Sequence, residues 1–169
     1  MKTLLNDIIN RLSQAPCPQS PQSPLYHHVD IDYGQLDFFD GPPPVKFPAA
    51  LIDIAAAEPS NLANRVQIDI VTLQVRIIDL ILSPSNARAT EEQKKAAFRS
   101  FDLITETNRL LHGWTGAEHY GPLTRAGFQK INRRDQLREY RLTYKVQLTN
   151  SSAEKQAVKI KQPIISLEL

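Results

Sequence analysis

The sequence lacks the features of several protein classes. Its single cysteine, Cys17, cannot form an internal disulfide, and it lies between two prolines without a neighbouring base to activate the thiol. The six glycines are scattered, and none belongs to a phosphate-binding loop. A Gly-x-Ser-x-Gly nucleophile motif is absent as well. We therefore expect a protein that is not an enzyme and that uses no cofactor.

Membrane and secreted proteins are equally poorly matched. No apolar run approaches the roughly 20 residues that span a bilayer, and residues 1–7 do not resemble a signal peptide. A formal net charge of +2 is too small to indicate nucleic acid or membrane by itself. With 169 residues and 41% apolar content, the chain fits one domain with its own core. We expect no membrane contact and assembly in the cytoplasm.

The first part of the sequence predicts one short helix followed by strands. An amphipathic pattern predicts a helix over residues 4–13, with Thr3 as its N-cap. A proline-rich connector follows at residues 15–24. Alternating polarity then predicts strands over residues 25–33 and 45–55.

A third strand, over residues 65–78, has an unusual pattern. Its apolar side chains lie at even positions up to Ile70 and at odd positions from Val71 onward. Because side chains alternate strictly in a regular strand, the change predicts a bulge, a sharp twist or burial of both faces. We interpret Ile70 and Val71 as part of a contact between subunits.

The main helix is predicted over residues 91–112. Thr90 and Gln93 form a capping box, and Gly113 is a natural stop. One apolar stripe consists of Ala97, Phe98, Phe101, Ile104 and Leu111. Leu103 and Leu110 lie nearly opposite that stripe, which predicts that a loop or another subunit covers them. Trp114 follows the helix and either caps the core or anchors an interface.

The last part of the sequence predicts an antiparallel hairpin over residues 128–148, with a turn near residues 133–135. Residues 151–169 form an extension with strand character, interrupted by Pro163. The strands cluster instead of alternating with helices. This order predicts an α+β domain over residues 1–150, with a largely antiparallel sheet and both helices on one face.

Two groups of side chains could carry chemistry. His28, Asp30 and Asp32 share one strand face, which is compatible with a metal-dependent hydrolase but more typical of a solvated face; we predict no metal site. A basic segment carries about +5. It could face DNA phosphates or an acidic protein, or be an ordinary solvated face. Its basic residues are Arg125, Lys130, Arg133, Arg134, Arg138, Arg141 and Lys145.

The order of these elements resembles the tail terminator or tail-completion proteins of tailed bacteriophages and of related prophage tail-like particles. The shared order is a short helix, a strand pair, a long strand, a main helix and a closing antiparallel pair. The segment Val29–Asp37, leading to Pro44–Ile52, is also similar to uncharacterised prophage-borne proteins. The family has no invariant motif, so the resemblance brings no catalytic residues with it.

The resemblance implies a ring of six subunits in a virion. Such a ring terminates the tail tube, joins it to neck or head proteins, and lets DNA pass through its lumen. Head-to-tail contacts that close on themselves produce rings. Subunit contacts would then use Ile70, Val71, Leu103, Leu110 and Trp114, and the lumen would be flanked by Arg133, Arg134, Arg138, Arg141 and Lys145. The alternatives are a tube, baseplate or head–tail connector subunit of such a particle, or a non-specific DNA-binding module.

Overall fold

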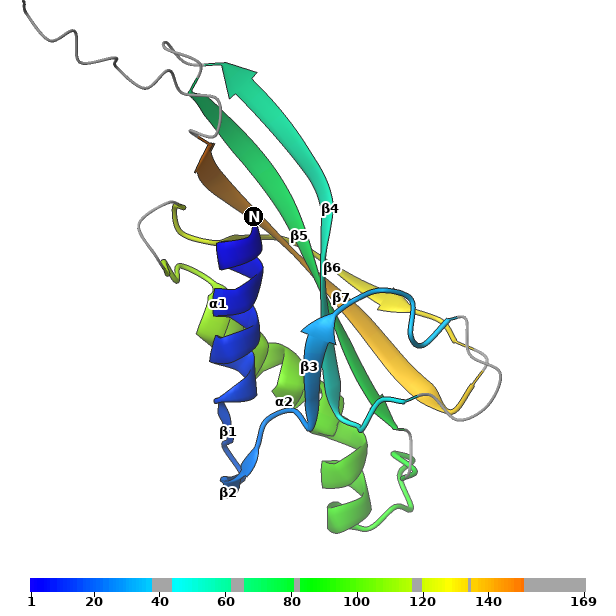
Figure 1. Cartoon of the computed structure of the whole chain (residues 1–169). Helices are drawn as coiled ribbons and strands as arrows, with labels where there is room; N and C mark the ends of the chain where they lie inside the picture. The colour runs from blue at the N-terminus through cyan, green and yellow to red at the C-terminus, as the bar shows by residue number, and fades with distance from the viewer. Residues whose placement is uncertain (38–43, 62–65, 81–82, 117–119, 134, 151–169) are drawn as a thin grey trace, which may run out of the picture.

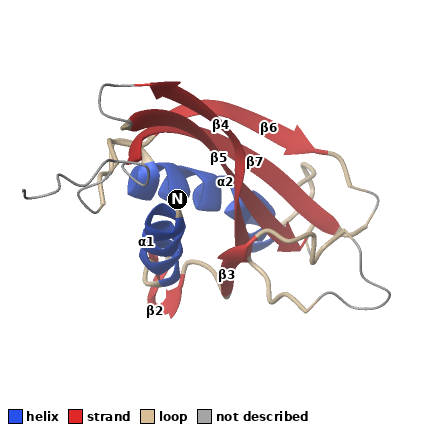
Figure 2. Cartoon of the chain, turned by 45° about the horizontal axis from the view of Figure 1, so that its top comes forward, coloured by secondary structure: helices blue, strands red, loops and turns tan. Residues whose placement is uncertain are grey.

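The centre of the molecule is a twisted five-stranded sheet with two helices on one face (Figures 1 and 2). The computed structural model describes residues 1–37, 44–61, 66–80, 83–116, 120–133 and 135–150. The sheet has the order β3-β4-β5-β7-β6, and every adjacent pair is antiparallel except β3 and β4. Its strands are β3 (His28–Ile31), β4 (Ala49–Asn61), β5 (Gln67–Leu80), β6 (Thr124–Ile131) and β7 (Leu137–Asn150). The predicted α+β class is confirmed.

The helices α1 (Lys2–Ser13) and α2 (Glu91–Leu111) cover one face of the sheet, which we call the inner face. The capping box of Thr90 and Gln93 begins α2 as predicted. By contrast, Met1 is the N-cap residue of α1 and makes no side-chain cap, so the prediction of Thr3 was wrong. The core between helices and sheet is mainly aliphatic, with Tyr26, Tyr120, Tyr140 and Tyr144 among its buried side chains. Its aliphatic members include Leu4, Ile8, Leu12, Leu73, Val75, Ile77, Leu142 and Leu111.

The orientation of α2 differs from the predicted one. Leu103 is only 3% exposed and faces the sheet, whereas Phe98 and Phe101 are 51% and 48% exposed. The helix can turn Thr107 inward because its hydroxyl is satisfied there, donating to Leu103 O and lying 2.5 Å from the Tyr26 hydroxyl. Buried polar groups are nearly always hydrogen-bonded, and these contacts compensate the loss of water around the Thr107 hydroxyl. The two large rings therefore lie at the rim.

The long strand β5 is regular throughout. It pairs with β7 without interruption from Gln67 to Leu80, and the register shift lies instead in β4, between Ile54 and Ala56. Val71 therefore points into the core, while Ile70 points to the opposite face and is 36% exposed. The expected bulge in β5 was therefore wrong. Burial of both faces, the other expectation, occurs nearer the end of the strand, from Val75 to Asp79.

The proline-rich connector forms a small hairpin of β1 (Pro16–Cys17) and β2 (Ser20–Pro24). It is held to α2 by Gln19, whose amide donates to Asp102 at 2.6 Å. The strand extension predicted for residues 151–169 lies outside the described residues. No helix among the described residues is long and apolar enough to cross a membrane.

The second face of the sheet, the outer face, is covered in part by the chain between β3 and β4. Parallel pairing of consecutive strands requires a crossover connection, and here both flanks of that connection pack on the sheet. They enclose a second, smaller apolar cluster of Leu36, Val45, Ala49, Leu51, Ile78 and Leu137. The predicted inward set of β7 (Tyr140, Leu142, Tyr144, Val146 and Leu148) is buried on the inner face, as expected.

Candidate assembly surfaces

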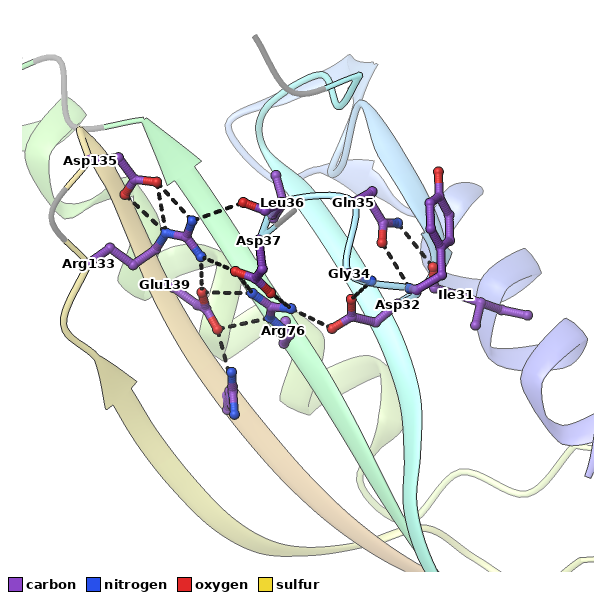
Figure 3. Close-up of polar contacts among 12 residues, drawn as sticks. Ile31, Asp32, Gly34, Gln35, Leu36, Asp37, Arg76, Arg133, Asp135 and Glu139 are labelled. Atoms are coloured by element: carbon purple, nitrogen blue, oxygen red, sulfur yellow. Dashed lines mark hydrogen bonds and ion pairs between the residues drawn. The ribbon is translucent and has the colours of Figure 1, made fainter. Parts of the chain in front are cut away.

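An ionic network beside the second apolar cluster holds the crossover connection to the outer face (Figure 3). Its centre is Arg76 on β5, which is only 5% exposed. The guanidinium donates to Glu139 at 2.9 and 3.0 Å, to Asp32 at 2.6 Å and to Asp37 at 3.0 Å. Asp32 and Asp37 belong to the connection, so one arginine ties that segment to two neighbouring strands.

Arg133 provides a second cation to the same network. It donates to Asp37 at 3.0 Å, to Glu139 at 2.9 Å and to the carbonyl of Leu36 at 3.2 Å. Asp135 accepts from it as well, at 2.8 Å. Glu139 is fully buried, and its hydrogen bonds to the two arginines offset the cost of removing its carboxylate from water.

The electrostatics of this network favour its charged form. Burial raises the pKa of Glu139, but hydrogen bonds from Arg76, Arg133 and Arg141 outweigh it and leave that pKa below its usual value. Asp37 follows the same pattern, with burial opposed by Arg76 and Arg133. The Arg133 hydrogen bond lowers the pKa of Asp135. Burial also disfavours the Arg76 cation, yet its three carboxylate partners raise its pKa overall.

The predicted basic patch is consequently much smaller than the sequence implies. Arg133 is part of the network, Arg138 donates to the carbonyl of Ala97 on α2 at 2.5 Å, and Arg141 donates to Glu139 at 3.1 Å. Arg134 lies outside the described residues. The sequence shows the charges but not these partners, so the prediction of an open basic face is corrected for Arg133, Arg138 and Arg141. Contact with DNA stays a prediction.

The residues predicted for subunit contacts are also divided by the structure. Val71 is fully buried and Leu103 nearly so, both in the protomer's own core, so neither can contact a neighbour and this prediction was wrong. The reason is the rotation of α2 and the regularity of β5. Leu110 is half-buried and packs against the same core. Of the predicted interface set, Ile70 is partly exposed on the outer face and Trp114 is partly buried against the core, so their contact with a neighbour stays a prediction.

Trp114 closes one end of the core. The Arg11 guanidinium lies 4.7 Å from the centre of the indole ring, and the ring of Tyr120 meets it edge-on at 6.2 Å. Arg11 also donates to the carbonyl of Leu110 at 2.6 Å, which joins α1 to the end of α2. Of the two roles that the sequence left open for Trp114, capping the core is the one that these contacts support.

Ile70 and Lys145, predicted for different roles, lie together on the outer face. With Gly121, Pro122, Thr124, Val146 and Gln147 they line a shallow groove of about 310 Å³. Lys145 is exposed, while Ile70 offers a partly exposed apolar side chain beside it. The groove is suited to a shallow protein contact and offers no buried polar centre.

The network separates Asp32, which follows β3, from His28 and Asp30 on that strand. His28 and Asp30 approach to 3.9 Å, but Asp32 turns to Arg76. The described part of the chain contains no group of three or more side chains placed to hold a metal ion. The hydrolase alternative thus has no assembled set of ligands among these residues.

A surface that the sequence reading missed lies at the opposite edge of the sheet. Phe128 of β6 stacks on Tyr140 of β7, with ring centres 5.6 Å apart. Tyr140 meets Phe101 at 5.7 Å, and Phe101 meets Phe98 at 6.2 Å. Tyr140 is buried, but the three phenylalanines are each about half exposed. We call this line of four rings the aromatic surface.

The aromatic surface could not be found in the sequence alone, because Phe98 and Phe101 fit the predicted apolar stripe of the helix. Phe98 and Phe101 stand three residues apart on a helix whose buried stripe is complete without them. Exposed neighbouring phenylalanines are uncommon in an isolated protomer, because apolar patches are usually covered. β6 borders this surface, and among the described residues it has no strand on its other side.

No protein-family model matches the sequence, and no curated protein matches it. Among solved structures, a chain from the virion of a native gene transfer agent particle is similar, with a TM-score of 0.48 and 9% sequence identity. The similarity covers 87% of this chain and 95% of that chain. Likeness at this level carries no functional argument.

Proposed function

We propose that this chain is a structural subunit of a tailed phage or phage-like particle. In this role, copies form a ring that terminates the tail tube and joins it to the neck or head. The observation that carries the proposal is the aromatic surface, because three half-exposed phenylalanine rings in one line are typical of a protein contact. Its position beside a strand edge gives a neighbour both apolar area and backbone groups to bind.

The shape of the sheet supports the same role. The upper ends of β4 and β5 extend beyond both helices (Figure 1). Residues 55–60 of β4 are all exposed there, on a hairpin arm without a helix beneath it. Because β7 pairs with β5 as far as Gln67, this arm has three strands, with β4 on its outer side. Packing of the exposed part of β4 against a neighbouring subunit would stabilise the arm further. The arm and the aromatic surface occupy different parts of the protomer, as a head-to-tail contact requires.

The order of elements in the structure is the one on which the family resemblance rests: a short helix, strands, a long strand, a main helix and a closing antiparallel pair. A virion subunit of this kind needs no catalytic residue, metal or cofactor, and its partners are copies of itself, the tail tube protein and neck proteins. DNA would pass through the ring. The exposed Lys145 would flank the DNA, together with those predicted basic residues whose side chains the ionic network does not bind.

Light scattering coupled to size exclusion, over a wide concentration range and with negative-stain imaging, tests this proposal. We expect closed rings whose mass is a multiple of the 19.1 kDa protomer, with six as the expected number. Phe101→Asp should abolish the rings without unfolding the protein, because the side chain is half exposed. Tyr33→Asp is the matched control, since Tyr33 is 67% exposed beside β3 at the other edge of the sheet.

A chain that stays monomeric at every concentration, and that does not bind a purified tail tube, would contradict the proposal. Rings that persist unchanged in Phe101→Asp would show that the aromatic surface does not hold them together. DNA contact is measured separately by retention on immobilised duplex. Retention through the basic side chains should fall steeply as salt rises.

A further inference from the structure

We propose that the aromatic surface and the free edge of β6 receive residues 164–169 of a neighbouring copy as an added strand. This inference rests on the proposed ring and names the contact that closes it. Two surfaces of the protomer have no partner among the described residues. One is the line of half-exposed rings, and the other is the free edge of β6, which pairs with no described strand. Both lie at the same edge of the sheet.

The geometry at this edge fits an incoming strand. Phe128 is opposite Leu142 in the β6–β7 register, so its ring lies on the inner face, level with the helix. An added strand runs about 4.8 Å beyond β6. Its inward side chains would then contact Phe128 and the exposed flanks of Phe101 and Phe98. Strand addition of this kind obtains affinity from backbone hydrogen bonds and specificity from alternate side chains.

The chain itself contains a segment with the matching pattern. Ile165, Leu167 and Leu169 alternate with Ser166 and Glu168, so a strand over 164–169 would have one apolar face. Pro163 immediately precedes this run and is compatible with the start of an edge strand, because it cannot donate to a ladder. Thirteen residues, 151–163, connect it to the end of β7 and can span about 43 Å when extended.

The tail is expected to bind a neighbouring copy and not its own protomer, because residues 120–121 lie beside the end of β7. Gly121 donates to the carbonyl of Gln147 at 2.8 Å, and Tyr120 forms a bridge with Leu148. This segment occupies the side of β7 along which a returning tail would run toward its own β6. A tail that runs to a neighbouring copy does not have to pass this segment. Since the donating and receiving surfaces then differ, the contact is head-to-tail and can close into a ring.

The first experiment measures the contact without requiring a ring. A fluorescent peptide of residues 155–169 is titrated into the full-length Leu167→Asp variant, whose own tail is disabled. We expect saturable binding with a Kd on the order of 10 µM. Adding Phe101→Asp to the protein should weaken binding at least tenfold, and adding Tyr33→Asp should leave it unchanged. A peptide with Ser166→Asp should still bind, because Ser166 lies on the polar side of the strand. Absence of binding overturns the proposal.

The second experiment decides between a neighbour and the same chain. Leu167→Asp retains a receiving surface, and Phe101→Asp retains a donating tail, so neither assembles alone but an equal mixture should give a discrete heterodimer by light scattering. A mixture that stays monomeric despite peptide binding places the tail on its own protomer and overturns the proposal. If the wild-type protein forms rings and the Leu167→Asp variant forms them as well, the proposed tail contact is overturned, but the proposed ring function is not.

Discussion

The two faces of the sheet are closed in different ways. On the inner face, α1 and α2 bury a large core of aliphatic and tyrosine side chains, and the polar contacts are few, among them Tyr26 with Thr107, and Asp79 with Arg99 near the end of β5. On the outer face, a crossover connection covers a much smaller apolar cluster, and Arg76 with its carboxylate partners supplies the remaining contacts. A loop offers too little apolar area to hold itself down, so charge pairs fix its position. The inner face should therefore respond to lost volume, and the outer face to lost charge.

The largest effect is expected from Arg76→Met. This change leaves the buried Glu139 carboxylate without its bidentate partner, frees Asp32 and leaves Asp37 with Arg133 alone. Breaking a buried ion pair from one side costs about 3–5 kcal/mol. Urea unfolding should show that loss, whereas Lys145→Met, on the exposed part of the same face, should change stability by less than about 0.5 kcal/mol.

The double variant Arg76→Met/Glu139→Leu refines that result. Removing both charges replaces a buried pair by apolar groups, so much of the lost stability should return. A double variant as unstable as Arg76→Met alone would mean that Asp32 and Asp37, and not Glu139, determine the cost.

The pH dependence of stability provides the next comparison. Asp37, Asp135 and Glu139 have lowered pKa values in the fold, so their contribution is complete above the unfolded pKa values near 4 and is lost as pH falls through the folded ones. Stability should therefore be level above about pH 5 and decrease below it. Glu139→Gln should flatten part of that decrease in acid unfolding curves.

A core substitution is the matched control for the pH series. Leu73→Ala on the inner face should cost about 2–5 kcal/mol by lost burial and cavity formation. Because no charge is involved, its cost should be the same at pH 4 and pH 7. A cost that changed strongly with pH would show that the two faces are coupled.

Periodicity in the sequence predicted the inward side chains of β7 well and the contacts of the outer face poorly. The alternation of Tyr140, Leu142 and Tyr144 was enough to place β7, since one buried apolar face leaves a period of two. Arg76 and Glu139 have no periodic pattern of this kind. In the sequence each is typical of a solvent-exposed position, and only the folded connection near Asp37 buries them. Long-range pairing of this kind has no local pattern.

The candidate surfaces illustrate the same limit. Leu103 and Phe101 lie two residues apart on α2, and the sequence assigned the wrong one to the core. Both positions are apolar and fit an amphipathic helix, so the rotation of α2 was decided by tertiary contacts such as the hydrogen bond between Tyr26 and Thr107. The aromatic surface follows from that rotation and could not be derived before it.

The smallest effect is expected at the start of α2, which closes the inner face. The Thr90 hydroxyl accepts from the backbone N–H of Gln93 at 3.3 Å, and the Gln93 side chain accepts from the N–H of Thr90 at 3.0 Å. Thr90→Ala removes half of this box and should cost about 1 kcal/mol in thermal or urea unfolding. Thr105→Ala is the control, because the Thr105 hydroxyl donates only within the helix, to the carbonyl of Phe101. Equal effects for the two variants would mean that the cap contributes nothing beyond the loss of a threonine, and that packing alone holds this end of the helix on the sheet.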